Sequence, residues 1–178
     1  MAQAKRKKIF FDVEMPLINK ETHLLAYDLK ELEGRIIKYD LTRMLKGKNL
    51  LLQLKVKIEG DKAVAIPKKT ELLSSFLKRM VRKGTNYVED SFSTECKDGQ
   101  VRIKPFLVTR RKVSRAVRKA LRDKTKEELI SYAKDKTTET LFKDLLKNSI
   151  QKPLSLKLKK IYPLSVCEIR VLKIEKEK

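Results

Sequence analysis

The chain has 178 residues, and its 44 Lys and Arg against 23 Asp and Glu leave a formal net charge of +21 at pH 7. This length favours one domain, and so large a positive excess repels itself unless a polyanion, RNA or DNA, neutralises it. No apolar run approaches the roughly 20 residues that a membrane-spanning helix needs. No secretory signal is visible either, so we expect a cytoplasmic protein with no membrane partner.

Catalytic chemistry has few candidate residues. The two cysteines, Cys96 and Cys167, are far apart, and the single His23 cannot complete a zinc site, which needs about four thiolate or imidazole ligands. The five glycines form no phosphate-binding loop. The acids sit beside lysines, which favours surface ion pairs over a Mg²⁺ site. We therefore expect two reduced thiols, no cofactor, no metal and no enzymatic activity.

The N-terminal third combines a basic segment with strand signals. Residues 1–8, MAQAKRKK, lack an apolar period, which predicts a basic arm that is disordered alone and follows a phosphate backbone when bound. A merely solubilising tail is the alternative. Residues 9–13 and 22–27 each favour a short strand, and Gly34 leads a third strand at 35–41.

A hairpin is expected next. A turn over residues 40–47 precedes residues 50–59, where apolar and mainly polar side chains alternate. This period of two predicts a strand with one buried row. The dipeptide at 60–61 favours a hairpin turn, and we expect the returning strand 62–66 to stop at Pro67.

A helix and a second hairpin follow. Thr70 is the candidate N-cap of a helix that Gly84 ends, with Lys78, Arg79, Arg82 and Lys83 on its polar half. Residues 86–96 then form a hairpin with residues 100–109. Pro105 lacks the amide that a central strand needs, which predicts an edge position or a bulge there.

The stretch Arg110 to Lys126 holds nine Lys or Arg against the single acid Asp123. As one helix it places an apolar stripe on one side and cations on the other. Like charges three or four residues apart repel, so we expect the cationic face to meet nucleic acid. The expected stripe is Val113, Ala116, Val117, Ala120 and Leu121, and Arg110 belongs to the junction before the helix.

The remaining elements complete the fold. Thr125 and Glu128 have capping-box spacing, which predicts a fresh helix start, and Thr137 or Thr138 caps another helix. Pro153 to Tyr162 fits either a short helix or a strand, and residues 165–174 form a closing strand. We expect a single α+β domain over residues 9–174, built on hairpins with helices on one side or end of the sheet, and a frayed tail at 175–178.

Several stretches together resemble one protein family. They are LEGRIIKYDLTRMLKG, KDGQVRIKPFLVT, the basic RRKVSRAVRKALRDK, TLFKDLLKNSI and, above all, KKIYPLSVCEIRVLKI. In this order they resemble the small-subunit ribosomal protein three-A family of archaea and eukaryotes, also called eukaryotic-type protein S-one. The segment from Pro67 to Val88 matches the family poorly. The N-terminal arm is also shorter than in eukaryotic-type members, and their acidic C-terminal extension is missing.

The resemblance implies an antiparallel β-barrel-like sheet with flanking helices. It also implies a structural role in the small ribosomal subunit, on the platform near the mRNA exit and the 3′ end of the rRNA. The implied partners are small-subunit rRNA, neighbouring platform proteins and mRNA near the exit. A free-standing RNA chaperone or DNA-compacting protein and a metal-dependent ribonuclease are the alternative functions.

Because no aromatic residue lies between Arg110 and Arg122, we expect contact through phosphates and shape rather than base stacking. The candidate RNA-binding residues are Lys5, Arg6, Lys7, Lys8, Lys78, Arg79, Arg82, Arg110, Arg111, Lys112, Arg115, Arg118, Lys119 and Arg122.

Overall fold

The structure of the chain is a computed structural model, which describes residues 7–60 and 62–177. Lys5 and Arg6, and with them most of the predicted basic arm, lie outside the described residues. The chain forms two compact units. The first is built from Met1–Tyr39 and Leu52–Lys68, and the second from Asp40–Leu51 and Lys69–Lys178. The single domain expected over residues 9–174 stays a prediction.

The first unit begins with a hairpin. Strands β1 (Ile9–Met15) and β2 (Lys20–Ala26) pair antiparallel over their whole lengths, so both short strands predicted here are confirmed. Next to them β1 runs parallel to β5, with Val13 opposite Ala63. The parallel pair arises because a short 3-10 helix, η1 (Leu29–Leu32), and two further strands separate β2 from β5. The sheet is therefore mixed, and the all-antiparallel expectation is wrong.

Strands β3 (Ile36–Asp40) and β4 (Leu50–Glu59) form where the sequence predicted them. The alternation along β4 buries every second side chain from Leu50 to Val56, as a strand with one core-facing row requires. The turn between β3 and β4 is closed at both ends. Thr42 donates its backbone N–H to Asp40 at 2.8 Å, and the Gly47 N–H bonds the Thr42 carbonyl at 3.0 Å.

Strand β5 (Lys62–Leu72) is longer than expected and runs through Pro67. Its pairing with β1 ends at Val64, and its pairing with β9 begins at Lys69. Pro67 falls between these two partners, so its missing N–H costs no hydrogen bond to either. This extension also overturns Thr70 as a helix cap. Thr70 is 1% exposed inside β5 and lies opposite Leu172.

The second unit is organised on a long antiparallel pair, β8 (Gly99–Thr109) and β9 (Leu164–Glu177). Strands β6 (Tyr87–Glu89) and β7 (Phe92–Cys96) pair with the other edge of β8. Pro105 therefore lies in a central strand, which excludes the edge alternative. The bulge alternative is confirmed, because the β8–β9 register shifts between Lys104 and Pro105.

Strand pairing follows the order β2-β1-β5-β9-β8-β6, while β3 pairs with β4, β4 with β5, and β7 with β8. Among the described residues this path is open, since its terminal strands β2 and β6 do not pair with each other. Within residues 7–60 and 62–177 the α+β class is confirmed, with four α-helices and a mixed, unclosed nine-stranded sheet. The barrel-like arrangement and the basic arm are not confirmed.

Helix α1 covers only Ser74–Met80, and no side chain caps its start. Helix α2 (Arg115–Lys134) is continuous and begins later than predicted, with Ser114 as its N-cap. The fresh helix start predicted at Thr125 is wrong. Thr125 is buried and donates its hydroxyl to the Leu121 carbonyl at 2.6 Å, so it stays inside the helix.

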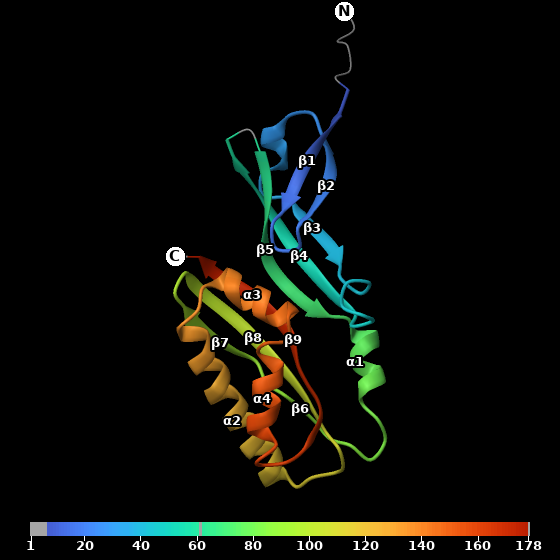
Figure 1. Cartoon of the computed structure of the whole chain (residues 1–178), viewed down its shortest axis with the longest axis vertical. Helices are drawn as coiled ribbons and strands as arrows, with labels where there is room; N and C mark the ends of the chain where they lie inside the picture. The colour runs from blue at the N-terminus through green and yellow to red at the C-terminus, as the bar shows by residue number, and fades with distance from the viewer. Residues whose placement is uncertain (1–6, 61, 178) are drawn as a thin grey trace, which may run out of the picture. The chain divides into compact units, whose positions relative to one another are not determined.

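The last two helices agree with the sequence. Helix α3 (Thr138–Leu146) is capped by Thr137, which accepts a hydrogen bond from the Thr140 N–H at 3.4 Å. Helix α4 (Gln151–Leu158) confirms the helical alternative around Pro153. Proline is tolerated there because the N–H groups of the first helical turn have no partner within the helix. Within the second unit, α2, α3 and α4 lie along strands β7, β8 and β9 (Figure 1).

We expect Leu145→Ala to lower the free energy of unfolding by about 2–5 kcal/mol, because the substitution leaves a cavity in a packed core. Leu145 is 1% exposed on α3, whereas Leu156 on α4 is 70% exposed. The control Leu156→Ala should change stability by no more than about 0.5 kcal/mol. Urea denaturation of the two variants measures both values, and equal losses would contradict this packing.

Both cysteines should react slowly as thiols in the native protein. Burial and the neighbouring Glu168 charge raise the pKa of Cys167 to about 12, and burial and Asp98 raise the pKa of Cys96 to about 11. Because only the thiolate reacts, alkylation by iodoacetamide at pH 8 should be roughly 10²- to 10³-fold slower than in urea. Similar rates in the folded and unfolded protein would show that these thiols are not held protonated.

Candidate nucleic-acid interface

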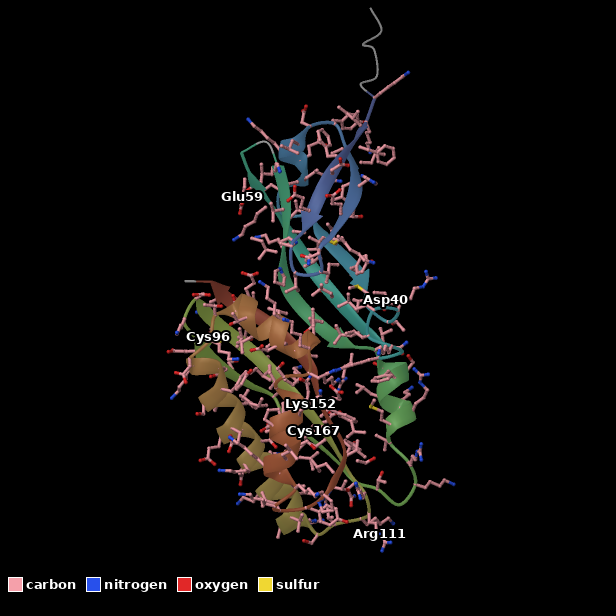
Figure 2. All side chains as sticks on the ribbon, in the orientation of Figure 1. Asp40, Glu59, Cys96, Arg111, Lys152 and Cys167 are labelled. Carbon is pink, nitrogen blue, oxygen red and sulfur yellow. The ribbon has the colours of Figure 1, made fainter. Side chains whose placement is uncertain are left out.

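The late start of α2 divides the predicted basic helix in two. Arg110, Arg111 and Lys112 precede the Ser114 cap in an exposed, non-helical segment. Figure 2 places Arg111 at the end of the second unit that is remote from Cys96. The cations after the cap extend from this segment along α2. The basic stretch is thus a loop followed by a helix rather than one continuous cationic face.

The buried face of α2 differs from the expected stripe. It consists of Leu121, Thr125, Leu129 and Ala133, spaced four residues apart, whereas Ala116 and Ala120 of the expected stripe are exposed. The helix packs against β7, β6 and α4, and its larger buried side chains, which begin at Leu121, set its rotation. Ala side chains have too little apolar area to compete.

Arg118 is affected by this rotation. It is half-buried, and its Nε is buried without a hydrogen-bond partner among the described residues. An unpaired buried donor of this kind is costly. Arg118 therefore does not belong to the freely exposed face on which the sequence placed it.

Arg115, Lys119 and Arg122 are exposed on α2 at positions i, i+4 and i+7, which places them on one side of the helix. None of the three forms an ion pair within residues 7–60 and 62–177. They repel one another, because the side-chain positions are adjacent and the charges are alike. In the isolated chain no ion pair within the described residues offsets the repulsion among these three charges.

The second half of α2 is neutralised. Lys124 lies 2.9 Å from Glu127, and Lys157 of α4 lies 2.5 Å from Glu128. The hydrogen bond from Lys157 holds the pKa of Glu128 below its ordinary value, against the opposing effect of burial. The second half of α2 therefore contains acids that pair with cations, whereas Arg115, Lys119 and Arg122 have no ion pair within the described residues.

A cluster of hydrogen bonds at the end of β8 brings a second basic segment to this place. The Thr109 N–H bonds the Asn86 carbonyl at 2.9 Å, and the Asn86 N–H bonds the Thr109 hydroxyl at 3.0 Å. The Asn86 side-chain carbonyl accepts the Val113 N–H at 2.8 Å. The segment before Asn86, which carries the exposed Arg82 and Lys83, is therefore fixed beside the segment that precedes α2.

Helix α4 contributes a third segment. Lys157 meets Glu128, and one small pocket joins Ile150 and Leu154 to Leu129 and Tyr132. The two helices are therefore antiparallel, as Figure 1 shows. The chain therefore leaves α4 in the direction of the first half of α2, and the exposed Lys159 and Lys160 follow there. The sequence did not predict these two lysines as RNA-binding residues. Its one local signal was a turn near Tyr162 and Pro163.

We call this surface the basic end. Its cations come from three segments that are distant in the sequence, and no ion pair involves any of them in the described part of the chain. The basic end comprises Arg82, Lys83, Arg110, Arg111, Lys112, Arg115, Arg118, Lys119, Arg122, Lys159 and Lys160.

The other predicted site residues lie elsewhere. Lys78 is exposed on α1, whereas Arg79 is partly occupied: its Nη2 donates to Asn49 at 3.0 Å, and its guanidinium lies 5.7 Å from the Phe76 ring centre. Lys7 and Lys8 belong to the first unit, where Lys8 lies 5.3 Å from the Tyr27 ring centre. Lys5 and Arg6 are outside the described residues.

The residues that the structure describes contain no group of three His, Cys, Asp or Glu side chains placed to hold a metal ion. Glu89 and Glu128 form ion pairs with Arg170 and Lys157. No helix in the described ranges is long and apolar enough to cross a membrane.

An α+β fold with unpaired cations gathered at one end defines a basic protein with a localised cationic surface. Comparison with known proteins gives its family. The model of the ribosomal S3Ae family matches residues 2–178, and the chain belongs to this family.

Curated relatives agree with the match. The small ribosomal subunit protein eS1 of Nanoarchaeum equitans is 29% identical over 180 residues, which cover 96% of this chain and 90% of the relative. The protein of the same name from Pyrobaculum aerophilum is 30% identical over 140 residues. That alignment covers 78% of this chain but only 63% of the relative. The chain thus spans less than two thirds of the Pyrobaculum protein.

Asn86→Ala should loosen the basic end without unfolding the protein. It removes the acceptor for the Val113 N–H, a loss of about 1 kcal/mol, and frees the segment before α2. We expect faster trypsin cleavage after Arg110, Arg111 and Lys112, mapped by mass spectrometry. Asn49→Ala, which removes only the acceptor for Arg79, serves as the control. Unchanged cleavage in Asn86→Ala would show that Asn86 does not hold this segment.

Proposed function

We propose that this chain is a structural, rRNA-binding component of the small ribosomal subunit. The observation that carries the proposal is the basic end, a set of unpaired cations from three segments in a member of the ribosomal S3Ae family. The relatives named small ribosomal subunit protein eS1 support the assignment. The protein has no catalytic role in this proposal and resides in the cytoplasm as part of the subunit.

The basic end recognises the phosphate backbone. Each exposed guanidinium or ammonium group neutralises one phosphate and releases its condensed counterions. Arginine adds paired N–H donors that match two phosphate oxygens. Because Arg115, Lys119 and Arg122 repel one another in the free protein, RNA relieves that repulsion as well as adding contacts. Arg118 contributes from a half-buried position.

The finer placement rests on the family resemblance. The protein lies on the platform near the mRNA exit and the 3′ end of the rRNA, beside neighbouring platform proteins and mRNA. The basic arm with Lys5, Arg6, Lys7 and Lys8 extends the contact, and Lys78 adds a cation on α1. Lys83, Lys159 and Lys160 join the RNA-binding set on the geometry of the basic end.

Reversing three charges on the exposed side of α2 tests the proposal. The triple variant Arg115→Glu, Lys119→Glu and Arg122→Glu leaves the buried face of α2 unchanged, so it should fold. Its incorporation into small subunits should be lost, because three phosphate contacts become repulsions. Sedimentation of tagged protein expressed in its own cells, followed by immunoblotting of the gradient fractions, measures the effect.

The matched control reverses three exposed lysines near the remote end of the second unit, Lys97, Lys134 and Lys176. Its net charge equals that of the α2 variant, so a general charge effect would reduce incorporation in both. Normal incorporation of the α2 variant would show that this surface does not bind rRNA.

Salt dependence gives a second measurement. If six to ten phosphates are contacted, affinity for a minimal rRNA fragment should fall by roughly 10³- to 10⁵-fold between 50 and 200 mM salt. The α2 variant should show a shallower dependence. Equally tight binding to duplex DNA and to rRNA would favour a free-standing nucleic-acid-binding protein instead.

A further inference from the structure

The second unit contains a cavity that the phosphate-binding role leaves unused. It has a volume of about 450 Å³ and lies between α1 and the sheet. Its walls carry apolar groups from Leu77 and Val81, the ring of Tyr87, and the charged groups of Lys78, Glu89 and Arg170. Small-ligand sites have this size and this mixture of apolar wall and few polar groups.

Tyr87 provides an aromatic surface in this cavity. Its ring stacks on the buried Phe106 with centroids 6.2 Å apart and an interplanar angle of 23°. Phe106 supports the ring from one side, yet Tyr87 remains 56% exposed. A fixed and exposed aromatic ring is what an unpaired nucleobase stacks on. Tyr87 lies outside the stretch from Arg110 to Arg122, whose lack of aromatic residues is the basis for expecting no base stacking.

The polar groups of the cavity suit a nucleoside. Arg170 Nη1 donates to both carboxylate oxygens of Glu89, each at 3.2 Å. This pairing offsets the carboxylate charge, while its oxygens retain lone pairs to accept from an exocyclic amine or a ribose 2′-hydroxyl. Lys78 is exposed on the opposite wall and forms no ion pair within the described ranges. A phosphate attached to the nucleoside therefore has a cation available.

Tyr87 is also continuous with the basic end. It directly follows Asn86, whose hydrogen bonds to Thr109 and Val113 fix the segment that carries Arg82 and Lys83. RNA whose phosphates lie on the basic end can therefore extend along this segment toward the cavity. The cations of the basic end and Lys78 favour a nucleotide over an apolar side chain of a protein partner.

We propose that this cavity binds one unpaired nucleotide of the RNA, with its base stacked on Tyr87 and its sugar or base edge bonded to Glu89. The inference rests on the proposed rRNA-binding function and adds a contact to single-stranded RNA beside the duplex phosphates. The cavity thereby distinguishes an RNA with an unpaired base from a continuous duplex.

Tyr87→Ala and Tyr87→Phe in the full chain separate stacking from other effects. We expect Tyr87→Ala to weaken binding of single-stranded RNA by about 5- to 150-fold, the usual effect of removing one stacking ring. Duplex RNA of the same length should bind unchanged. Tyr87→Phe should behave like the parent protein, and the salt slope should not change, because no phosphate contact is lost. Equal effects of Tyr87→Ala on both RNAs would overturn the proposal.

A fluorescence variant covers the case in which Tyr87→Ala fails to fold. The chain contains no tryptophan, so Tyr87→Trp creates a single reporter that keeps an aromatic ring on Phe106. Single-stranded RNA should quench its fluorescence in a saturable manner and duplex RNA should not. Tyr39→Trp in the first unit is the control. The absence of quenching would overturn the proposal.

The outcomes also separate this inference from the proposed function. If the α2 charge reversal abolishes RNA binding and incorporation while Tyr87→Ala changes neither, only the nucleotide site fails. If the α2 charge reversal is also without effect, the proposed function fails as well. Unchanged RNA binding by Tyr87→Ala combined with lost incorporation would assign the cavity to a neighbouring protein and overturn the nucleotide site.

Discussion

The long antiparallel ladder between β8 and β9 is the constraint on which the second unit depends. It spans the register from Gly99 opposite Glu177 to Thr109 opposite Leu164. Helices α3 and α4 contact β9, and α2 contacts α4 and the strands β6 and β7 that pair with β8, so the positions of these helices follow from the ladder. A part-buried ion pair of 2.6 Å between Lys48 and Glu168 fixes the turn after β3 to the same strand β9. The elements that carry the basic end are thus all attached to one pair of strands.

Charge is distributed unequally along this scaffold for a physical reason. Where two elements pack together, as α2 and α4 do at Glu128, cations are paired with acids. Where the chain faces outward at the beginning of α2, acids are nearly absent and the positive charge remains. Stability and partner binding therefore use different parts of the same helix. A substitution that alters one function need not alter the other.

The sequence predicted correctly those structural features that depend only on residues close together in the chain. The alternation in β4, the hairpin at Asp98–Gly99 and the Thr137 cap involve residues within a few positions of one another, and all three formed. The start of α2 was not predicted, because the closely spaced cations before Ser114 also fit a helix and Ser114 is the one capping residue among them. Thr70 has the sequence signal of a cap but is held in β5 by its pairing with β9. Lys83, Lys159 and Lys160 could not be assigned to the basic end from the sequence, because tertiary contacts alone bring their segments to α2.

The origin of the basic end in three separate segments has a consequence for how the protein is made. The cations of the basic end are separated by many residues, and during synthesis they emerge from the ribosome one segment at a time. Strand β9, which completes the ladder beneath them, is synthesised after every one of these cations. A nascent chain therefore carries these cations before they are assembled into the basic end. An RNA that needs the three segments side by side recognises only the completed fold.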